Sequence, residues 1–181
     1  MKIYTKTGDK GETSFYDGSR AMKSNINFEV IGEIDELSSR VGMLCALIDK
    51  HHFTFNLRKF QATLQDINSH IATINKTKYK LPELEPIIVT ELENAIDEME
   101  KVNPKLTKFI LPGVTQTDAF AHMCRTQTRK VERMIIGLQI EQPDIVPEIV
   151  LQYINRLSDF FFVFARWICS IKSIPEYFAG N

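Results

Sequence analysis

Three arginines follow one another at four-residue steps in a segment of helical hydrophobic periodicity. Arg125, Arg129 and Arg133 therefore share one ridge of the expected helix, and His122 and Glu132 stand on the same stretch. Planar guanidinium groups suit bidentate binding of phosphate. Because a row of like charges repels itself, an anionic ligand or nearby acids must compensate it, and Glu132 could pair with Arg129 or Arg133. The ridge is a candidate phosphate site or, alternatively, an ordinary solvated face.

A second polar segment interrupts an apolar, aromatic stretch further along the chain. The sequence N-R-L-S-D there contains Asn155, Arg156, Ser158 and Asp159. Arg156 and Asp159 are three residues apart, so a structural ion pair would account for both. Asn155 has donors and acceptors, and it could instead contact an adenine edge or a ribose.

The N-terminal segment is rich in glycine, threonine and lysine. Residues 5–14 read T-K-T-G-D-K-G-E-T-S. Glycines let backbone amides approach an anion, and Lys6 and Lys10 add positive charge. The order G-x-x-x-x-G-K-[ST] of a P-loop is absent. The segment is thus either a flexible tail or a loop that closes, with the two polar helix faces, on a nucleoside triphosphate.

Amphipathic helices are expected to position these residues, because apolar side chains recur at three- and four-residue steps. Prolines and polar links separate the periodic segments. Thr115 and Asp118 supply helix caps. A short extended segment is expected at 108–113, and a short strand at 2–5. Helices are predicted at 27–50, 55–75, 85–102, 115–142 and 147–171.

Long helices with short connections predict an all-α, up-and-down five-helix bundle. The 181 residues are interpreted as a single domain, with an ordered loop over 1–26 and the helical bundle over 27–172. Helices of about 25 residues would be about 37 Å long, so an elongated molecule is expected.

Charge and cysteine content narrow the function classes. The formal net charge of −1 gives no overall field that favours nucleic acid or an anionic membrane. Cys45, Cys124 and Cys169 are too dispersed for a disulfide framework or a zinc site, and they are interpreted as small core residues. The sequence shows no secretory signal and no apolar run long enough to span a bilayer. A cytoplasmic protein without membrane or nucleic-acid partners is expected.

A di-iron bundle is one alternative for such a helical chain. Its signature is Glu-x-x-His on two helices. None of the histidines has a glutamate three residues before it, so the sequence disfavours this alternative; they are His51, His52, His70 and His122.

Five ordered blocks of the chain resemble the PduO-type ATP:cob(I)alamin adenosyltransferases. The blocks are K-I-Y-T-K-T-G-D-K-G-E-T-S at 2–14, G-E-I-D-E-L-S-S at 32–39, F-I-L-P-G at 109–113, R-T-Q-T-R-K-V-E-R at 125–133 and Y-I-N-R-L-S-D at 153–159. Their order and spacing agree with the family. The resemblance implies a ferritin-like five-helix bundle that assembles as a homotrimer, with active sites at the subunit interfaces.

The resemblance also implies roles for individual residues. Asp35 and Arg125 match an intersubunit ion pair beside the corrinoid, and Phe109 matches an aromatic residue under the corrin ring. Arg129 is expected to stabilise charge on the departing triphosphate. The implied nucleotide contacts are Thr5, Lys6, Thr7, Gly8, Thr13, Ser14, Lys23, Arg129, Lys130, Glu132, Arg133 and Asn155.

The implied activity is transfer of the 5′-deoxyadenosyl group of ATP to cob(I)alamin, which forms adenosylcobalamin and releases triphosphate. Phe109 would displace the lower axial base of cobalt(II), and the loss of axial electron donation eases reduction to nucleophilic cobalt(I). The implied small molecules are ATP, the corrinoid and a Mg²⁺ ion held by the phosphates, without a protein metal site. A flavin-type reductase and an adenosylcobalamin-dependent enzyme are the expected protein partners.

The chain departs from the family pattern at several positions. Val114 stands where a second glycine commonly follows L-P-G, and it could narrow the approach to the corrin. Lys130 replaces a frequent arginine, and Cys124 and Gln127 replace smaller or apolar residues. The Val114 departure leaves open a non-enzymatic bundle that binds ATP or corrinoid as a carrier or regulator.

Overall fold

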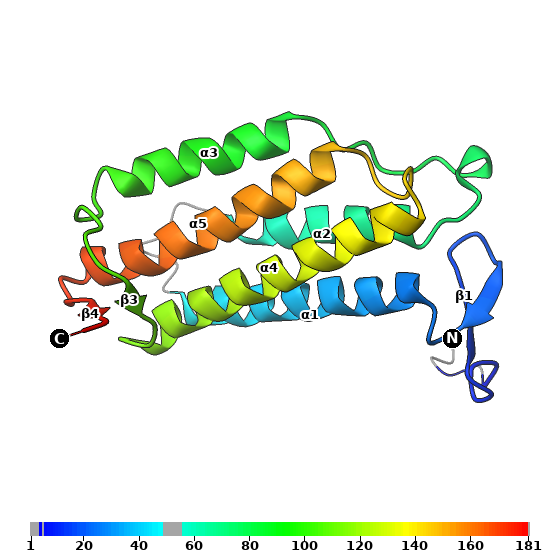
Figure 1. The fold of residues 1–181 in the computed structure, drawn as a ribbon, viewed down its shortest axis with the longest axis horizontal. Helices are drawn as coiled ribbons and strands as arrows, with labels where there is room; N and C mark the ends of the chain where they lie inside the picture. Colours follow the sequence, from blue (N-terminus) through cyan, green and yellow to red (C-terminus); the bar gives the residue numbers. More distant parts are fainter. Residues whose placement is uncertain (1–3, 5, 49–55, 181) are drawn as a thin grey trace.

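The computed structural model describes residues 4, 6–48 and 56–180. Its long helices run alternately up and down along one elongated bundle (Figure 1). The predicted all-α, five-helix architecture is confirmed, and the bounds of the last three helices were predicted within two residues. The helices are α1 (Ile26–Leu47), α2 (Arg58–Ile71), α3 (Ile87–Glu100), α4 (Gln116–Glu141) and α5 (Ile149–Ile171).

Helix α2 ends earlier than its hydrophobic pattern predicts. The prediction extended to residue 75, whereas the helix ends at Ile71. Beyond it, the carboxylate of Asp17 accepts hydrogen bonds from the amides of Ile74 at 3.1 Å and Asn75 at 2.7 Å. The chain then forms a short 3-10 turn, η1 (Lys76–Lys78). A side chain distant in the sequence therefore takes backbone groups that a longer helix would have used.

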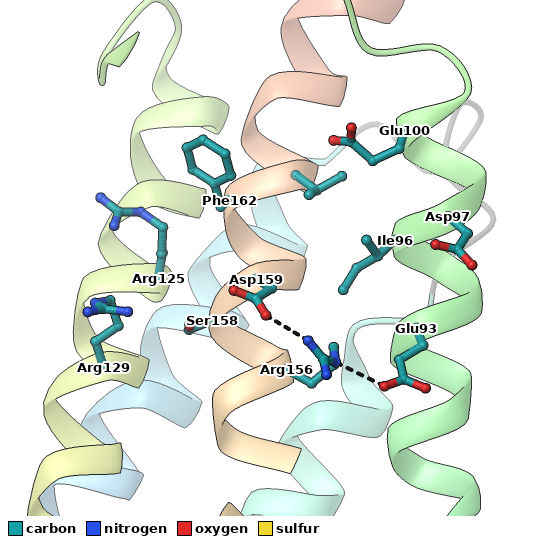
Figure 2. A pocket seen from close by; sticks show the side chains of 11 residues that line it. Glu93, Ile96, Asp97, Glu100, Arg125, Arg129, Arg156, Ser158, Asp159 and Phe162 are labelled. Atoms are coloured by element: carbon teal, nitrogen blue, oxygen red, sulfur yellow. Dashed lines mark hydrogen bonds and ion pairs between the residues drawn. The ribbon is translucent and has the colours of Figure 1, made fainter. Parts of the chain in front are cut away.

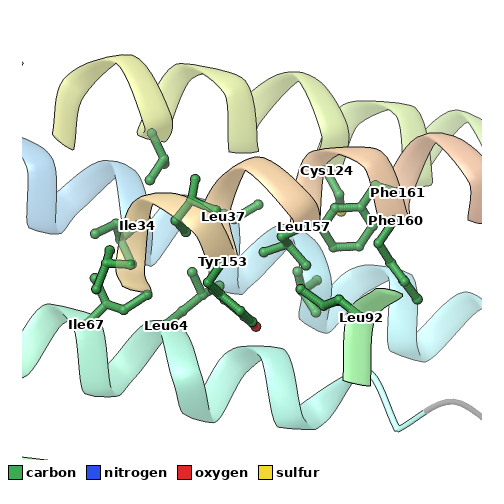
Figure 3. Close-up of a cluster of buried hydrophobic side chains, with 14 of the residues drawn as sticks. Ile34, Leu37, Leu64, Ile67, Leu92, Cys124, Tyr153, Leu157, Phe160 and Phe161 are labelled. Carbon is green, nitrogen blue, oxygen red and sulfur yellow. The ribbon is translucent and has the colours of Figure 1, made fainter. Parts of the chain in front are cut away.

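The core lies where α1, α2, α4 and α5 meet. Helix α4 lies between α1 and α5 (Figure 1). Ile34 and Leu37 of α1 face Leu64 and Ile67 of α2 (Figure 3), and each of these four side chains is fully buried. Burial of one such side chain contributes about 2 kcal/mol. Packing of these stripes, rather than helix propensity alone, sets the positions of the helices.

One end of the bundle is fixed by a pair of side-chain amides. The side chain of Gln142 donates to Oδ1 of Asn27 at 2.8 Å, and Asn27 Nδ2 donates to the carbonyl of Ile71 at 3.2 Å. Asn27 is fully buried. The start of α1 is thereby joined to the ends of α2 and α4.

The N-terminal segment contains a hairpin that the sequence analysis missed. Strands β1 (Glu12–Ser14) and β2 (Arg20–Met22) pair antiparallel, with Glu12 opposite Met22. Three-residue strands are too short for an alternating pattern to be recognised. Of the strand predicted at 2–5, only Tyr4 is described, and it lies outside any strand; the others are outside the described residues.

A second small sheet lies at the opposite end of the bundle (Figure 1). Strand β3 (Ile110–Leu111) lies in the extended segment that the sequence predicted, and it pairs antiparallel with β4 (Tyr177–Phe178). The sequence analysis did not anticipate this partner strand.

The cysteines pack as expected. Cys124 and Cys169 are buried, and Cys45 is half-buried. Burial raises the pKa of the Cys124 thiol to about 12 and that of Cys169 to about 11. Both thiols therefore act as small apolar groups. Over residues 6–48 and 56–180, none of the helices has the length and hydrophobicity needed to cross a membrane.

Candidate functional site

The arginine ridge of α4 borders a cleft of about 750 Å³, with α3 and α5 on its other sides (Figure 2). Arg125 and Arg129 line it from α4, and Phe162 of α5 adds an apolar wall. Among the described residues, neither of these arginines forms an ion pair with an acid. The α4 side of the cleft therefore carries positive charge without an ion-pair partner, while the acids of the lining, Glu93, Asp97, Glu100 and Asp159, lie on α3 and α5.

Arg125 is held by a neutral histidine. Its Nε lies 3.4 Å from Nδ1 of His122. Burial, together with the charge of Arg129, lowers the pKa of the Arg125 guanidinium. Burial, and secondly the charge of Arg125, lowers the pKa of His122 to about 4. At neutral pH the imidazole is therefore an acceptor for Arg125 and adds no charge of its own.

The third arginine of the cleft is neutralised. Arg156 donates to Glu93 of α3 at 3.1 Å and to Asp159 at 2.9 Å (Figure 2). The structural ion pair expected for Arg156 and Asp159 is confirmed, and α3 contributes a second acid. The free positive charge of the cleft therefore lies on α4.

Glu132 does not neutralise the ridge as the sequence suggested. Its Oε1 accepts a hydrogen bond from Asn155 Nδ2 at 2.9 Å, which links α4 to α5. Arg133 donates instead to the backbone carbonyl of Arg129 at 2.9 Å. The prediction of local pairing is wrong, because an amide on the neighbouring helix lies closer to this carboxylate than either guanidinium does. Glu132 thus positions Asn155.

Glu33 of α1 is a charged residue that the sequence analysis overlooked. Lys130 Nζ lies 2.6 Å from its Oε1, and Gln127 Nε2 donates to its Oε2 at 2.7 Å. Hydrogen bonds from Lys130 and then Gln127 lower the pKa of this carboxyl. Glu33 lies in the block G-E-I-D-E, two residues before Asp35, for which the sequence predicted the ion pair. Asp35 is exposed and forms no pair with Arg125 within the chain; their intersubunit pair stays a prediction.

The glycine-containing N-terminal loop is folded rather than extended. The amide of Gly11 donates to the carbonyl of Gly8 at 3.2 Å, and the amide of Lys23 donates to the carbonyl of Gly11 at 2.8 Å. A Cβ placed on Gly8 would lie 3.3 Å from Lys23 Nζ, so the ammonium group lies against the loop backbone. Lys6 has a φ of 61°, a conformation that non-glycine residues seldom adopt. The loop thus brings Gly8, an expected nucleotide contact, against Lys23.

Arg20 of β2 holds the rest of this loop. It donates to the carbonyl of Thr7 at 3.2 Å and pairs with Glu12 at 3.1 Å. Thr13 and Ser14 belong to β1. Thr5, another expected contact, lies outside the described residues. Arg20 is a second positioning residue that the sequence analysis overlooked.

Phe109 is exposed at the end of the bundle that carries β3 and β4. Its side chain is 88% exposed, and those of Leu111 and Tyr177 are 50% and 61% exposed. Leu111 and Tyr177 face each other across β3 and β4. On the far side of the turn, the Asp118 carboxylate accepts from the amide of Gly113 at 3.1 Å. An apolar surface is thus presented to solvent on a fixed backbone.

Within one chain these residues fall into separate groups. The β1–β2 hairpin, which Lys23 directly follows, lies at one end of the bundle, and β3, which Phe109 directly precedes, lies at the other end (Figure 1). The arginine cleft lies between α3, α4 and α5. Helix α4 alone has 26 residues, or about 39 Å of length. The predicted residues therefore do not form one continuous site within a single chain.

Comparison with known proteins identifies the family to which a chain with these three groups of residues belongs. The family model for cobalamin adenosyltransferase matches residues 3–168. The chain belongs to the cobalamin adenosyltransferase family. The corrinoid adenosyltransferase of Bacillus subtilis is 40% identical over 97% of this chain and 91% of that protein. The corrinoid adenosyltransferase MMAB of Homo sapiens is 40% identical over 92% of this chain and 68% of that protein.

Solved structures agree with this family assignment. A variant PduO-type ATP:corrinoid adenosyltransferase from Lactobacillus reuteri, complexed with cobalamin and ATP, matches with a TM-score of 0.91 and 36% identity. The match covers 99% of this chain and 100% of that one. The described helices and both small sheets thus belong to a cobalamin adenosyltransferase fold.

The buried contact between His122 and Arg125 predicts an acid-sensitive fold. The unfolded histidine titrates near 6.5 and the folded one near 4, so the unfolded state binds more protons between these values. The free energy of unfolding should be highest above pH 6.5 and should fall as the pH drops towards 4. Denaturant titrations across this range would measure it. In His122→Asn, whose amide oxygen can still accept from Arg125, this part of the slope should vanish; an unchanged slope would contradict the assignment.

Proposed function

We propose that this chain transfers the 5′-deoxyadenosyl group of ATP to the cobalt(I) of a corrinoid such as cob(I)alamin. The observation that carries the proposal is the uncompensated pair Arg125 and Arg129, which borders a cleft in a chain of this family. The folded loop with Lys6 and Lys23 supplies further cations, and Phe109 supplies an exposed apolar surface.

The reaction needs alignment and charge stabilisation more than it needs an acid or a base. Cobalt(I) donates its electron pair to the 5′ carbon, so a cobalt–carbon bond forms. The bond between that carbon and the 5′ oxygen breaks, and its electron pair leaves on triphosphate. The guanidinium of Arg129 and the ammonium groups of Lys6 and Lys23 would stabilise the charge that develops on the leaving oxygens. Asn155, held by Glu132, would orient the nucleoside.

A magnesium ion fits this chain only as a companion of the nucleotide. Within the part of the chain that the structure describes, no three His, Cys, Asp or Glu side chains are grouped to hold a metal. Mg²⁺ is commonly bound through substrate phosphates and waters. The phosphate oxygens would therefore be its main ligands, and the ion would add to the charge stabilisation that the positive side chains supply.

The apolar surface around Phe109 would receive the lower face of the corrinoid. An aromatic ring in place of the axial base would leave cobalt(II) with four ligands and make its reduction easier. A flavin-type reductase is the proposed donor of the electron that reduces cobalt(II) to cobalt(I). The product would pass to an adenosylcobalamin-dependent enzyme, and a cytoplasmic location fits these partners.

The separation of the groups supports a site shared between chains. The hairpin of β1 and β2 and the strand β3 beside Phe109 lie at opposite ends of one bundle (Figure 1), whereas ATP and cobalt must meet. Ile136 and Ile140 are exposed and continue the Arg129 and Arg133 ridge towards the hairpin end. A second copy that covers this ridge would bring its own loop to the arginines. A homotrimer of single-domain chains, with three equivalent interfaces, is the proposed assembly.

Removal of the ridge cation should impair the use of ATP. With reduced corrinoid and ATP, the unmutated protein should develop the visible band of the cobalt–carbon product. Arg129→Ala should lower the rate at limiting ATP about 100-fold, because one preorganised charge on the leaving group is lost. Arg58→Ala, on the exposed surface of α2, is the matched control. Unchanged turnover at low ATP would contradict this role, and ATP binding without the product band would indicate a carrier.

Complementation should reveal whether two chains build each site. Lys23→Ala impairs the loop and Arg129→Ala impairs the ridge, so each variant alone should be nearly inactive. When the two variants are co-expressed in equal amounts and assemble at random, one site of each mixed trimer, or about a quarter of all sites, should combine an intact loop with an intact ridge. Recovery of activity, measured with the molar mass of the assembly, supports a shared site. No recovery in verified mixed assemblies would place both groups in one chain's site.

The Phe109 surface should control the coordination of cobalt. Phe109→Ala should raise the five-coordinate fraction of bound cobalt(II) corrinoid and slow product formation, because the axial base is no longer displaced. Electron paramagnetic resonance and visible spectra would measure the two coordination states. Ile87→Ala, which shortens another exposed side chain on α3, is the control. Identical spectra for Phe109→Ala and the unmutated protein would rule out this role.

A further inference from the structure

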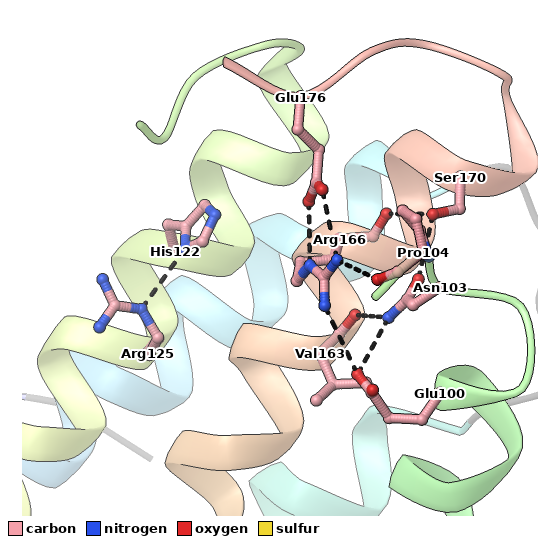
Figure 4. A network of polar contacts seen from close by, with 9 residues as sticks. All are labelled: Glu100, Asn103, Pro104, His122, Arg125, Val163, Arg166, Ser170 and Glu176. Atoms are coloured by element: carbon pink, nitrogen blue, oxygen red, sulfur yellow. Dashed lines mark hydrogen bonds and ion pairs between the residues drawn. The ribbon is translucent and has the colours of Figure 1, made fainter. Parts of the chain in front are cut away.

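A buried arginine lies behind the sheet that carries Phe109. Arg166 of α5 is only 2% exposed. Its Nε donates to Oε1 of Glu176 at 3.1 Å and its Nη2 to Oε2 at 3.4 Å, while Nη2 also donates to the carbonyl of Pro104 at 2.6 Å (Figure 4). Glu100 lies further away, at 3.9 Å. A charge this deep is costly to bury unless its partners are well placed, so the geometry around it is tightly set.

These contacts join three segments that are far apart in the sequence. Arg166 belongs to α5, Pro104 to the connection between α3 and β3, and Glu176 directly precedes β4. Asn103, beside Pro104, also donates to the carbonyl of Val163 at 3.1 Å (Figure 4). The start of the C-terminal segment is thus fixed against the packed part of the bundle.

The fixed segment leads directly to Phe109. Ile110 pairs with Phe178 across β3 and β4, and the amide of Ala179 donates to the carbonyl of Phe109 at 2.8 Å. The ring of Phe109 is 88% exposed, so its own packing contributes little to its orientation. Its backbone is held instead through β4, and β4 is held by the ion pair of Arg166 and Glu176.

We propose that the buried pair Arg166–Glu176 is a positioning device that fixes β4 and, through it, the direction in which Phe109 meets the corrinoid. This inference rests on the proposed function for its catalytic consequence, but the positioning itself can be measured without any substrate. Neither residue contacts the reacting atoms. Their role is to keep an exposed ring in one orientation.

Two substitutions interrupt this connection at different points. Glu176→Gln keeps the shape of the side chain but removes the charge that neutralises Arg166, and Glu176→Asp restores the charge. Ala179→Pro removes the amide that donates to Phe109, whereas Ala179→Gly keeps that amide. Residue 179 is exposed, so the proline variant should perturb folding little. It therefore still tests the connection between β4 and Phe109 if Glu176→Gln, which changes a buried charge, weakens folding. Leu64→Ala, which opens a cavity in the core between α1 and α2, controls for a general loss of stability.

Hydrogen–deuterium exchange of the amides of residues 109–111 measures the positioning. Exchange should rise at least about tenfold in Glu176→Gln and Ala179→Pro, and less in their matched controls. The four-coordinate fraction of bound cobalt(II) corrinoid should fall in the same two variants. Their kcat should fall at least about tenfold, while KM for ATP changes less than about twofold, because the loop and the ridge are untouched.

Unchanged exchange at 109–111 in both variants would overturn the proposal, as would an equal loss of kcat in Leu64→Ala at matched stability. Raised exchange with unchanged coordination spectra would also overturn it, because the ring would then meet the corrinoid without this support. If exchange rises as expected but the unmutated protein forms no cobalt–carbon product, the proposed function fails while the structural connection from Arg166 to Phe109 stands.

Discussion

Repulsion between Arg125 and Arg129 is the interaction on which the proposed site depends. Both charges lie on one ridge of α4, and no acid among the described residues pairs with either. Two neighbouring carboxylates have other partners: Glu132 accepts from Asn155, and Asp159 pairs with Arg156. The other acids of the cleft, Glu93, Asp97 and Glu100, lie across it on α3. The cost of this arrangement is borne by the packing of α4 between α1 and α5, which keeps the ridge in place. An anionic ligand would bind favourably here, because its negative charge would compensate the two arginine charges that have no acid partner.

The sequence predicted the helices well because their periodic stripes are also their packing faces. Ile34, Leu37 and Leu157 are fully buried where the pattern placed them. What it could not predict were contacts between distant segments. The end of α2 depends on Asp17, and β3 depends on a two-residue strand near the C-terminus. Local propensity contains no information about such partners.

The site was predicted in part, for a similar reason. Residue type and spacing marked the arginine ridge and the loop, and the ion pair of Arg156 follows from a three-residue step. The prediction that Glu132 pairs with the arginines failed because residue spacing within one helix contains no information about the neighbouring helix. There Asn155 donates a hydrogen bond to Glu132. Glu33 was overlooked because its partner Lys130 lies on another helix. The single-domain organisation and the intersubunit contacts stay predictions.

Val114 shows how a departure from a family pattern can be weighed physically. Glycine is the residue favoured where φ is positive, and in this turn that residue is Gly113, with a φ of 103°. Val114 has no such φ, and its amide donates to Asp118 at 3.2 Å as any residue's amide could. The backbone that leads from Phe109 into α4 is therefore unaffected by the valine. Only the volume of its side chain distinguishes it from glycine, so the departure bears on the width of the corrinoid approach and gives no reason to doubt the fold of the turn.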